Sequence, residues 1–368
     1  MQAEICCIMN LAPHYNAPIY RLMDAELKCD FFIGDRVSLS IKLMHYNELT
    51  GFKKELKNLK LAGNFYWQRN AVQLALKPYK KYIITGEPHC LSTWCILLIA
   101  RITGKKTFLW THGWYGNESK IKRLIKKIFF GLSSKVLLYG DYAKDLMIKE
   151  GFPADKLIPI YNSLDYSTQC KIRETLSETN IYREQFLNQF PVLLYIGRIQ
   201  KNKKLDLLIE AISVLYSRGV FCNLIIIGEE AERTNIYELV DRNKLGRFVW
   251  FYGPCYDEKK LGELIYNANL CVVPGDIGLT VMHSFVYGTP VITHNNYSKH
   301  GPEFEAIREG VTGAFFKENS VDDLCDKICN WITISIEKRE WIRHECYNII
   351  NEKYNPYRQI EILRNALL

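Results

Sequence analysis

The sequence predicts an α/β protein made of two Rossmann-like, doubly wound domains that face a cleft. Two observations lead to this prediction. Short apolar runs that suit buried parallel strands alternate with helical patterns along most of the chain. A polar, charged segment at residues 167–190 interrupts the alternation, which starts again at Val192. With 368 residues and 48% hydrophobic content, the chain is long enough for two hydrophobic cores.

The first domain is expected over residues 1–166, and 167–190 is expected to be a linker. Helical patterns at Leu91–Thr103 and Tyr142–Lys149 separate apolar runs, as in a parallel sheet with crossover helices. The expected strands of this half are Ile5–Met9, Cys29–Ile33, Tyr82–Thr85, Thr107–Trp110, Val136–Tyr139 and Leu157–Tyr161.

The second domain is expected over residues 191–350, and 351–368 form a closing helix. The stretch from Asp322 to Leu368 has a helical pattern that is interrupted near Asn355–Pro356. Apolar runs that end in or near glycine give the expected strands, which are Val192–Gly197, Asn223–Glu230, Phe248–Gly253, Leu270–Val273, Val291–Thr293 and Gly313–Phe316.

The most informative segment is 267–295, which is predicted to form strand, glycine-bearing turn, helix, Gly-Thr-Pro and strand. Gly278 is expected to open the helix with exposed main-chain N–H groups, and such a helix start suits a phosphate or another anion. An ordinary βαβ unit without a ligand explains the segment equally well.

Two cations follow the buried strand that begins at Val192. Arg198 comes directly after Gly197, and Lys203 follows five residues later, before a helical pattern. Ligands of open α/β sheets bind beyond the carboxyl ends of the strands, which is where these cations fall. A solvated loop at residues 201–204 is the alternative explanation.

These elements, in this order and spacing, resemble the nucleotide-sugar domain of the family-4 retaining glycosyltransferases of the GT-B fold, the group 1 glycosyltransferases. The resemblance implies that Gly197, Arg198 and Lys203 hold the diphosphate of a nucleotide-sugar donor. It also implies that His112, within Trp110–Trp114, lies near the donor sugar, with a satisfied loop histidine as the alternative. The closing helix at 351–368 would then return to the first domain.

The sequence departs from the family pattern at two places. The family carries two glutamates separated by seven residues, and Gly275 and His283 stand at those positions. We therefore expect His283 to contact the ribose and Asp276 to contact the sugar, aided by the nearby main chain, with Glu303 or Glu305 as alternative carboxylates. Gly278 and Leu279 complete the expected donor-binding set.

The second departure is in the loop after the first strand, residues 10–16, which lacks the family's glycines. A phosphate contact from the amides of this loop is not expected. His14 and Tyr15 are instead the candidates for binding the acceptor.

The charge of +8 is uneven, with 24 Lys and Arg against 14 Asp and Glu in residues 1–165. Nucleic acid, an acidic membrane surface and a diphosphate-bearing lipid all fit the sign, but no nucleic-acid-binding module is recognised. The segment Lys120–Leu132 sets five cations around an apolar stripe at helical spacing. Such a helix suits an acidic membrane surface, and packing of its stripe on the core is equally compatible.

Compartment and cofactors follow from absences in the sequence. No run of about 18 apolar residues occurs, and the N-terminus has no signal-peptide pattern, so a cytoplasmic protein is expected, and peripheral attachment at the inner face of the plasma membrane is compatible with this. The twelve cysteines include no Cys-x-x-Cys pair, which argues against zinc and redox chemistry and favours buried, reduced thiols. Neither a metal nor a cofactor is expected.

The preferred function is a glycosyltransferase that moves a sugar from a nucleotide-sugar to a glycan or lipid-linked acceptor, with retention, in cell-surface polysaccharide synthesis such as capsule formation. A nucleotide-binding module without turnover remains the alternative, because both glutamates are replaced. A dinucleotide-dependent oxidoreductase fits poorly, because no Gly-x-Gly-x-x-Gly pattern occurs.

Overall fold

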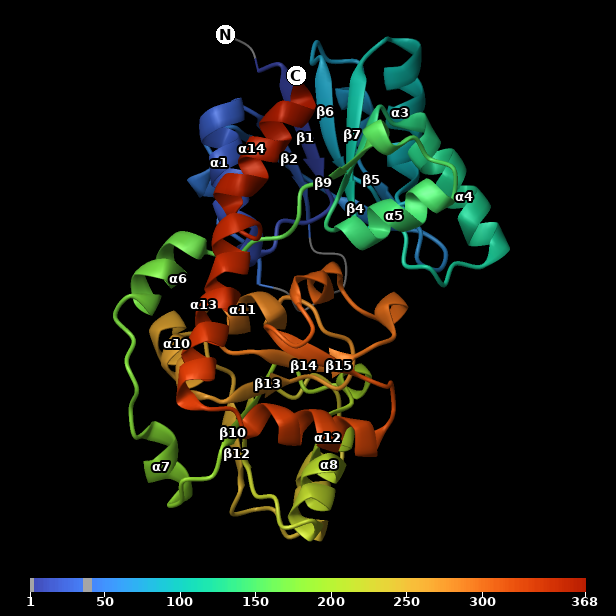
Figure 1. The fold of residues 1–368 in the computed structure, drawn as a ribbon. Coiled ribbons are helices and arrows are strands. Elements are labelled where there is room, and N and C mark those ends of the chain that lie inside the picture. Colours follow the sequence, from blue (N-terminus) through green and yellow to red (C-terminus); the bar gives the residue numbers. More distant parts are fainter. Residues whose placement is uncertain (1–2, 36–41) are drawn as a thin grey trace. The chain divides into compact units, whose positions relative to one another are not determined.

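The computed structural model describes residues 3–35 and 42–368. By its contacts the chain divides into two compact units. Unit 1 contains the described residues up to Asp165 together with Tyr354–Leu368, and unit 2 is Tyr166–Lys353. Each unit has a parallel sheet with helices on its faces, so the predicted α/β class is confirmed (Figure 1).

The sheet of unit 1 has the strand order β3-β2-β1-β6-β7-β8-β9, and every neighbouring pair is parallel. Its strands are β1 (Ile5–Met9), β2 (Asp30–Gly34), β3 (Phe52–Leu56), β6 (Lys81–Thr85), β7 (Lys106–Thr111), β8 (Lys135–Leu138) and β9 (Leu157–Pro159). Its main helices are α1 (Ala17–Leu27), α3 (Leu91–Ile102), α4 (Lys120–Leu132) and α5 (Asp141–Lys149).

Strand β1 shows why these runs are continuously apolar. Cys7 and Met9 belong to the hydrophobic cluster on one face of the sheet, and Cys6 and Ile8 belong to the cluster on the other. A parallel strand covered on both faces needs apolar side chains at every position. Eight of the twelve cysteines are buried, whereas Cys95, Cys170, Cys255 and Cys329 are partly exposed.

Helix α14 (Pro356–Leu367) belongs to unit 1 and packs beside α1 (Figure 1). Asn355 caps this helix by accepting a hydrogen bond from the Arg358 amide, and Pro356 occupies its first turn. The Gln359 side chain donates to the Tyr161 carbonyl oxygen and accepts from the Ser163 hydroxyl.

Four short elements of unit 1 escaped prediction. They are β3, the antiparallel pair β4 (Asn58–Lys60) and β5 (Tyr66–Gln68), and helix α2 (Ala71–Leu74). Strand β3, with the sequence FKKEL, lies at the sheet edge and exposes its three charged residues. Charged edge strands are common because they discourage further strand pairing, but their composition hides them from a search for apolar runs.

The sheet of unit 2 has the order β12-β11-β10-β13-β14-β15, again with parallel neighbours. Its strands are β10 (Val192–Ile196), β11 (Asn223–Ile227), β12 (Val249–Gly253), β13 (Leu270–Val272), β14 (Val291–His294) and β15 (Gly313–Phe316). Its main helices are α8 (Leu205–Ser217), α9 (Ile236–Arg242), α10 (Glu258–Asn267), α11 (Thr280–Val286), α12 (Val321–Ile332) and α13 (Ile336–Glu352). Helix α11 begins at Thr280, two residues after the expected Gly278.

The segment 167–190, expected to be a linker, contains two helices that pack within unit 2. Helices α6 (Tyr166–Arg173) and α7 (Ile181–Phe186) both contact α10. The buried Tyr182 side chain donates a 2.6 Å hydrogen bond to the Leu264 carbonyl oxygen. The chain passes from unit 1 to unit 2 after Asp165.

Candidate functional site

The glycines that end β10 and β11 shape the first part of the candidate site. Gly197 has φ 144° and Gly228 has φ 154°, values that residues with side chains rarely adopt. A Cβ atom at Gly228 would lie 1.9 Å from the Gly197 carbonyl oxygen. The two strand ends therefore approach as only glycine allows. Arg198 follows directly, with an exposed side chain that makes no hydrogen bond or ion pair within the described residues.

The loop after β10 is fastened to the loop after β13. The Lys203 ammonium, 16% exposed, donates a 2.6 Å hydrogen bond to the Asp276 carbonyl oxygen and lies 3.5 Å from the Asp276 carboxylate. Main-chain hydrogen bonds run from the Gly275 amide to the Lys203 oxygen and from the Asp276 amide to the Asn202 oxygen. The predicted residues Lys203 and Asp276 are thus brought into direct contact.

Gly275 has no room for a side chain. A Cβ atom there would lie 2.0 Å from the Asn202 carbonyl oxygen. The position at which the resemblance implies a glutamate is therefore closed by the neighbouring loop. The amide of Ile277 also has a partner inside the protein, the Nδ1 atom of His300 at 3.2 Å. The main chain of residues 275–277 was expected to meet a sugar, but its three amides are not available for that contact, because each already has a protein acceptor.

His300 and His294 form a buried pair beneath this loop. Their rings stack with centroids 3.9 Å apart, and His300 Nε2 donates to the His294 carbonyl oxygen at 2.8 Å. In each ring Nδ1 accepts a main-chain hydrogen bond, from Ile277 and from Asn296 respectively. Burial lowers the pKa of both rings, that of His294 to about 3. Both imidazoles are therefore neutral near pH 7.

Helix α11 is joined to the end of β10. The Thr280 hydroxyl donates a 2.9 Å hydrogen bond to the Ile196 carbonyl oxygen, one residue before Gly197. Of the predicted donor residues, Gly278 and Leu279 precede this helix and His283 lies on it, all three partly exposed. Glu303 is buried, and its Oε2 atom would lie 3.9 Å from a Cβ atom at Gly278.

His112 belongs to unit 1, directly after β7. Gly113 follows it with φ 71°, and a Cβ atom there would lie 2.6 Å from a methyl group of Leu138. Only glycine fits this turn, which sets the direction of the chain at His112. The His112 ring lies 4.7 Å from that of Tyr139, between centroids.

His112 lines a cavity of about 440 Å³ at the carboxyl ends of β1, β6 and β7. The lining residues are Asn10, Leu11, Asn64, Tyr66, Gly86, Glu87, Pro88, His89, Thr111, His112, Gly113, Tyr115, Lys126 and Phe130. Glu87 escaped the sequence analysis, although a Gly-Glu-Pro directly after a predicted strand was a usable signal. The predicted acceptor residues His14 and Tyr15 are not part of this lining. His14 is exposed, and its amide donates to the Lys42 carbonyl oxygen.

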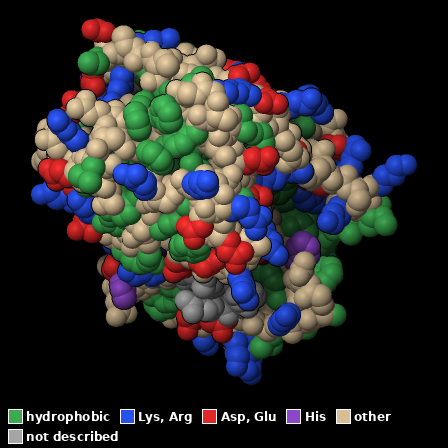
Figure 2. All heavy atoms as spheres, turned by 90° about the horizontal axis from the view of Figure 1, so that it is seen from below, with side chains coloured by type: hydrophobic (Ala, Val, Ile, Leu, Met, Phe, Trp, Pro, Cys, Tyr) green, Lys and Arg blue, Asp and Glu red, His purple; other side chains and the backbone are tan. Residues whose placement is uncertain are grey.

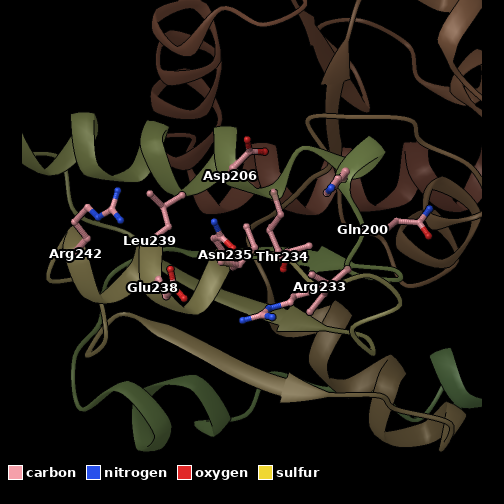
Figure 3. Close-up of a pocket in the computed structure, with 12 residues that line it drawn as sticks. Gln200, Asp206, Arg233, Thr234, Asn235, Glu238, Leu239 and Arg242 are labelled. Atoms are coloured by element: carbon pink, nitrogen blue, oxygen red, sulfur yellow. The ribbon is translucent and has the colours of Figure 1, made fainter.

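A second cavity, of about 610 Å³, lies in unit 2 between the start of α8 and α9 (Figure 3). Its lining mixes Arg233 and Arg242 with Asp206 and Glu238, so it has no single charge preference. It includes Gln200 from the loop after β10 but neither of the predicted cations, Arg198 and Lys203. Size alone does not make it the candidate site. Among the described residues, no cluster of three or more His, Cys, Asp or Glu side chains could hold a metal ion.

The comparison with known families bears on unit 2. Residues 177–346 match the model of the family described as glycosyl transferases group 1. This region is therefore similar to the group 1 glycosyl transferases. The match runs from before α7 into α13, and so includes the loops with Arg198, Lys203 and Asp276.

The curated relatives of this chain are distant. The chain is 25% identical over 205 residues to an α-D-kanosaminyltransferase of Streptomyces kanamyceticus, covering 53% of this chain and 50% of the relative. It is 29% identical over 104 residues to a GDP-mannose-dependent α-(1-6)-phosphatidylinositol dimannoside mannosyltransferase of Mycobacterium tuberculosis, covering 27% of this chain and 26% of the relative. The chain thus spans half or less of the length of these curated relatives.

Solved structures match over the whole chain. The lipopolysaccharide outer core galactosyltransferase WaaB superposes with a TM-score of 0.71 at 16% identity, covering 99% of this chain and 98% of that one. Anabaena Alr3699/HepE in complex with UDP superposes with a TM-score of 0.72 at 15% identity, covering 99% of each chain. This likeness confirms the GT-B fold that the sequence predicted.

Proposed function

We propose that this protein is a glycosyltransferase that moves a sugar from a nucleotide-diphosphate sugar to a glycan or lipid-linked acceptor. The observation that carries the proposal is the joined pair of loops in the region similar to the group 1 glycosyl transferases. The loop with Lys203 is held against Asp276, and the exposed Arg198 guanidinium stands at the end of β10. Both cations thus follow the carboxyl end of a central strand, where α/β sheets bind ligands.

The chemistry of the two cations fits a departing diphosphate. Negative charge develops on the leaving group as the bond to the sugar breaks, and fixed cations stabilise that charge. An ammonium group has three donors, and Asp276 takes at most two of those of Lys203. At least one donor is left for a phosphate oxygen. We propose that the diphosphate is held in this way without a metal or a cofactor.

The remaining donor contacts are part of the same proposal. Gly197 and the main chain of Gly278 and Leu279 border the diphosphate, Asp276 accepts a hydrogen bond from the sugar, and His283 contacts the ribose. In unit 1, His112 meets the donor sugar, and His14 and Tyr15 bind the acceptor. Retention of the anomeric configuration follows from the family resemblance.

The relatives guide the choice of donor and acceptor. HepE has been solved with UDP and glucose, and the mycobacterial relative is named as GDP-mannose-dependent. UDP- and GDP-sugars are therefore the first donors to test. We propose a role in cell-surface polysaccharide synthesis, as in a capsule, because other relatives are named for transfer to lipopolysaccharide core and to poly(ribitol-phosphate).

Helix α4 supports contact with an acidic membrane surface. Its stripe is not packed on the core, because Ile121 and Leu124 are 73% and 61% exposed and only Phe129 and Phe130 are buried. The neighbouring helix α3 adds the exposed Leu98 and Ile102, and α3 contacts α4. These exposed apolar side chains, with Ile125 and Ile128, are called the α3–α4 patch below.

The charges around the patch are partly compensated. Arg123 and Lys127 both pair with Glu150, and Lys126 pairs with Glu118, so fewer than five cations are available to lipid headgroups. The remaining balance is positive and still favours an acidic surface. Figure 2, which views the molecule from below, shows Lys and Arg beside hydrophobic side chains at its right margin. No helix in the described parts of the chain is long and apolar enough to cross a membrane. We propose a peripheral protein at the cytoplasmic face of the plasma membrane that does not bind nucleic acid.

A nucleotide-binding module without turnover is the second candidate function. The close packing at Gly275 favours this second candidate, because it leaves no room for the glutamate side chain that the family resemblance implies at that position. Release of the diphosphate separates the two candidates, since both bind the nucleotide.

The deciding experiment is a thermal-shift measurement with UDP, GDP and dTDP. At least one nucleoside diphosphate should raise the melting temperature, and Arg198→Ala should abolish the shift. Arg247→Ala is the matched control, because Arg247 is also exposed but lies before the amino end of β12, whereas Arg198 follows the carboxyl end of β10. The proposal fails if none of the three nucleotides shifts the wild type. Diphosphate release from the corresponding nucleotide-sugars, with membrane extract as acceptor, then tests turnover.

A further inference from the structure

Glu87 stands at the end of β6 because Gly86 lets the chain pass β7 closely. A Cβ atom at Gly86 would lie 2.9 Å from the Thr111 Cβ atom. The Gly86 amide donates to the Trp110 carbonyl oxygen at 2.8 Å, which extends the pairing of the two strands. Glu87 and His112 therefore follow adjacent strand ends, and both line the 440 Å³ cavity of unit 1.

The Glu87 carboxylate is fixed by two neutral donors. Asn10 Nδ2 donates to Oε1 at 2.9 Å, and the Tyr66 hydroxyl donates to Oε2 at 2.8 Å. A carboxylate has about four acceptor positions, so about two remain for a ligand. The side chain is held in one place without being saturated, as a binding group requires.

Glu87 also lacks a counter-ion. Within the described residues no cation pairs with it. Lys126 lines the same cavity, but its ammonium is held by the Glu118 carboxylate at 2.6 Å and by the Gly113 carbonyl oxygen at 2.8 Å. The cavity therefore presents one uncompensated acceptor group among aromatic and amide side chains such as Tyr115 and Asn64.

We propose that this cavity binds a hydroxyl-rich sugar of the acceptor and that Glu87 anchors it by accepting hydrogen bonds from its hydroxyl groups. The proposal rests on the proposed function. A sugar ring offers adjacent hydroxyl donors to a carboxylate and an apolar C–H face to an aromatic ring. An anionic ligand such as a diphosphate is disfavoured here by like-charge repulsion, so the cavity is distinct in chemistry from the cationic loop at Arg198.

The position of the cavity agrees with a lipid-linked acceptor. Lys126 and Phe130, which line it, belong to α4, the helix that carries most of the α3–α4 patch. A sugar held by Glu87 would thus lie beside a helix suited to a lipid surface. His112 is on the same lining and would lie near that sugar.

The test is direct binding of simple glycosides. Methyl α- and β-glycosides of glucose, galactose, mannose and N-acetylglucosamine are titrated against the full-length protein and followed by ligand-observed NMR. At least one should bind the wild type, and Glu87→Gln should weaken its binding about tenfold to hundredfold, the value of a hydrogen bond to a charged group. Glu4→Gln is the control, because Glu4 is an exposed glutamate of the same unit that lies before the amino end of β1, whereas Glu87 follows the carboxyl end of β6.

The inference is overturned if no glycoside binds the wild type, or if a glycoside binds Glu87→Gln as tightly as it binds the wild type. Glucosamine, which carries an ammonium group, is titrated as a further probe. Binding of glucosamine alone would also overturn the inference. If Glu87→Gln does not fold, Glu87→Asp decides, because it keeps the charge but withdraws the carboxylate by one methylene; unchanged binding then overturns the inference. The nucleoside diphosphate shift is measured on the same variants. It should persist in Glu87→Gln, so a failure at Glu87 is distinguished from a failure of the proposed function, in which no nucleotide shifts the wild type.

Discussion

Lys203 and Asp276 are held together by a 2.6 Å hydrogen bond from the ammonium to a main-chain carbonyl oxygen, with the carboxylate 3.5 Å from the same nitrogen. The carbonyl contact positions the cation, whereas the carboxylate partly neutralises it. A substitution can remove the second effect and leave the first.

Asp276→Asn should therefore strengthen the binding of a nucleoside diphosphate. Removing one negative charge near the Lys203 ammonium is worth about 1 kcal/mol in a solvated site, or roughly fivefold in Kd. The matching nucleotide-sugar should gain less or lose affinity, because the proposed contact between Asp276 and the sugar is weakened. Isothermal titration of both ligands measures the two changes. Weaker binding of the diphosphate itself would contradict the idea that Lys203 faces a phosphate.

Gly275→Ala should destabilise the protein. The added Cβ atom would lie 2.0 Å from the Asn202 carbonyl oxygen, so the loop that carries Lys203 must move. Overpacking of this kind costs about 1–3 kcal/mol. Urea denaturation gives the change in unfolding free energy, and the nucleoside diphosphate should bind less tightly as well. Gly246→Ala is the matched control, because no atom lies within 4 Å of its Cβ position. Equal stability of the two variants would refute the close packing at Gly275.

Stability should fall as the pH drops below about 6.5. Burial depresses the pKa of His294 and His300 in the folded state, so the unfolded chain binds more protons there. The stability that these neutral rings contribute is present above the unfolded pKa and is lost as the pH decreases toward the folded pKa. Protonation of His300 Nδ1 would also break its hydrogen bond from the Ile277 amide.

His300→Asn tests this pH dependence. The Asn side-chain oxygen can replace Nδ1 as the acceptor for the Ile277 amide but does not titrate. Chemical denaturation from pH 8 to pH 5 should show a shallower loss of stability for this variant than for the wild type. Parallel curves would show that His300 does not contribute to the acid sensitivity.

The α3–α4 patch should govern binding to lipid vesicles. The double variant Ile121→Ser with Leu124→Ser should lower partitioning into phosphatidylglycerol-containing vesicles about tenfold or more, because each buried aliphatic side chain contributes on the order of 1 kcal/mol or more. Co-sedimentation measures the partitioning. Ile336→Ser is the control, since Ile336 is 76% exposed but lies on α13 of unit 2. Equal binding of wild type and double variant would exclude the patch as the membrane contact.

The sequence predicted the fold well where burial dictates composition. Strands such as β10 and β13 are apolar at nearly every position because both faces of their sheets are covered. Strand β3 escaped because an edge strand exposes its charged side chains. The start of α11 was placed two residues early, because a glycine that opens a turn cannot be told from one that opens a helix.

The candidate site was predictable only in part. Arg198, Lys203 and Asp276 follow strand ends, a position that the order of elements along the chain indicates. The closure of the Gly275 position was not predictable, because it depends on a contact with Asn202, more than seventy residues away. Glu87 escaped for a similar reason, since Asn10 and Tyr66 meet it only after the sheet has formed.

Helix α14 makes the order of synthesis matter. Ile360, Leu363 and Leu367 complete a hydrophobic cluster that otherwise consists of residues 5–160. A nascent chain must therefore extend through all of Tyr166–Lys353 before its earliest strands can bury that face. The later-made unit, continuous in sequence, is free to mature first, while the earlier-made one waits with exposed apolar surface that a chaperone would recognise.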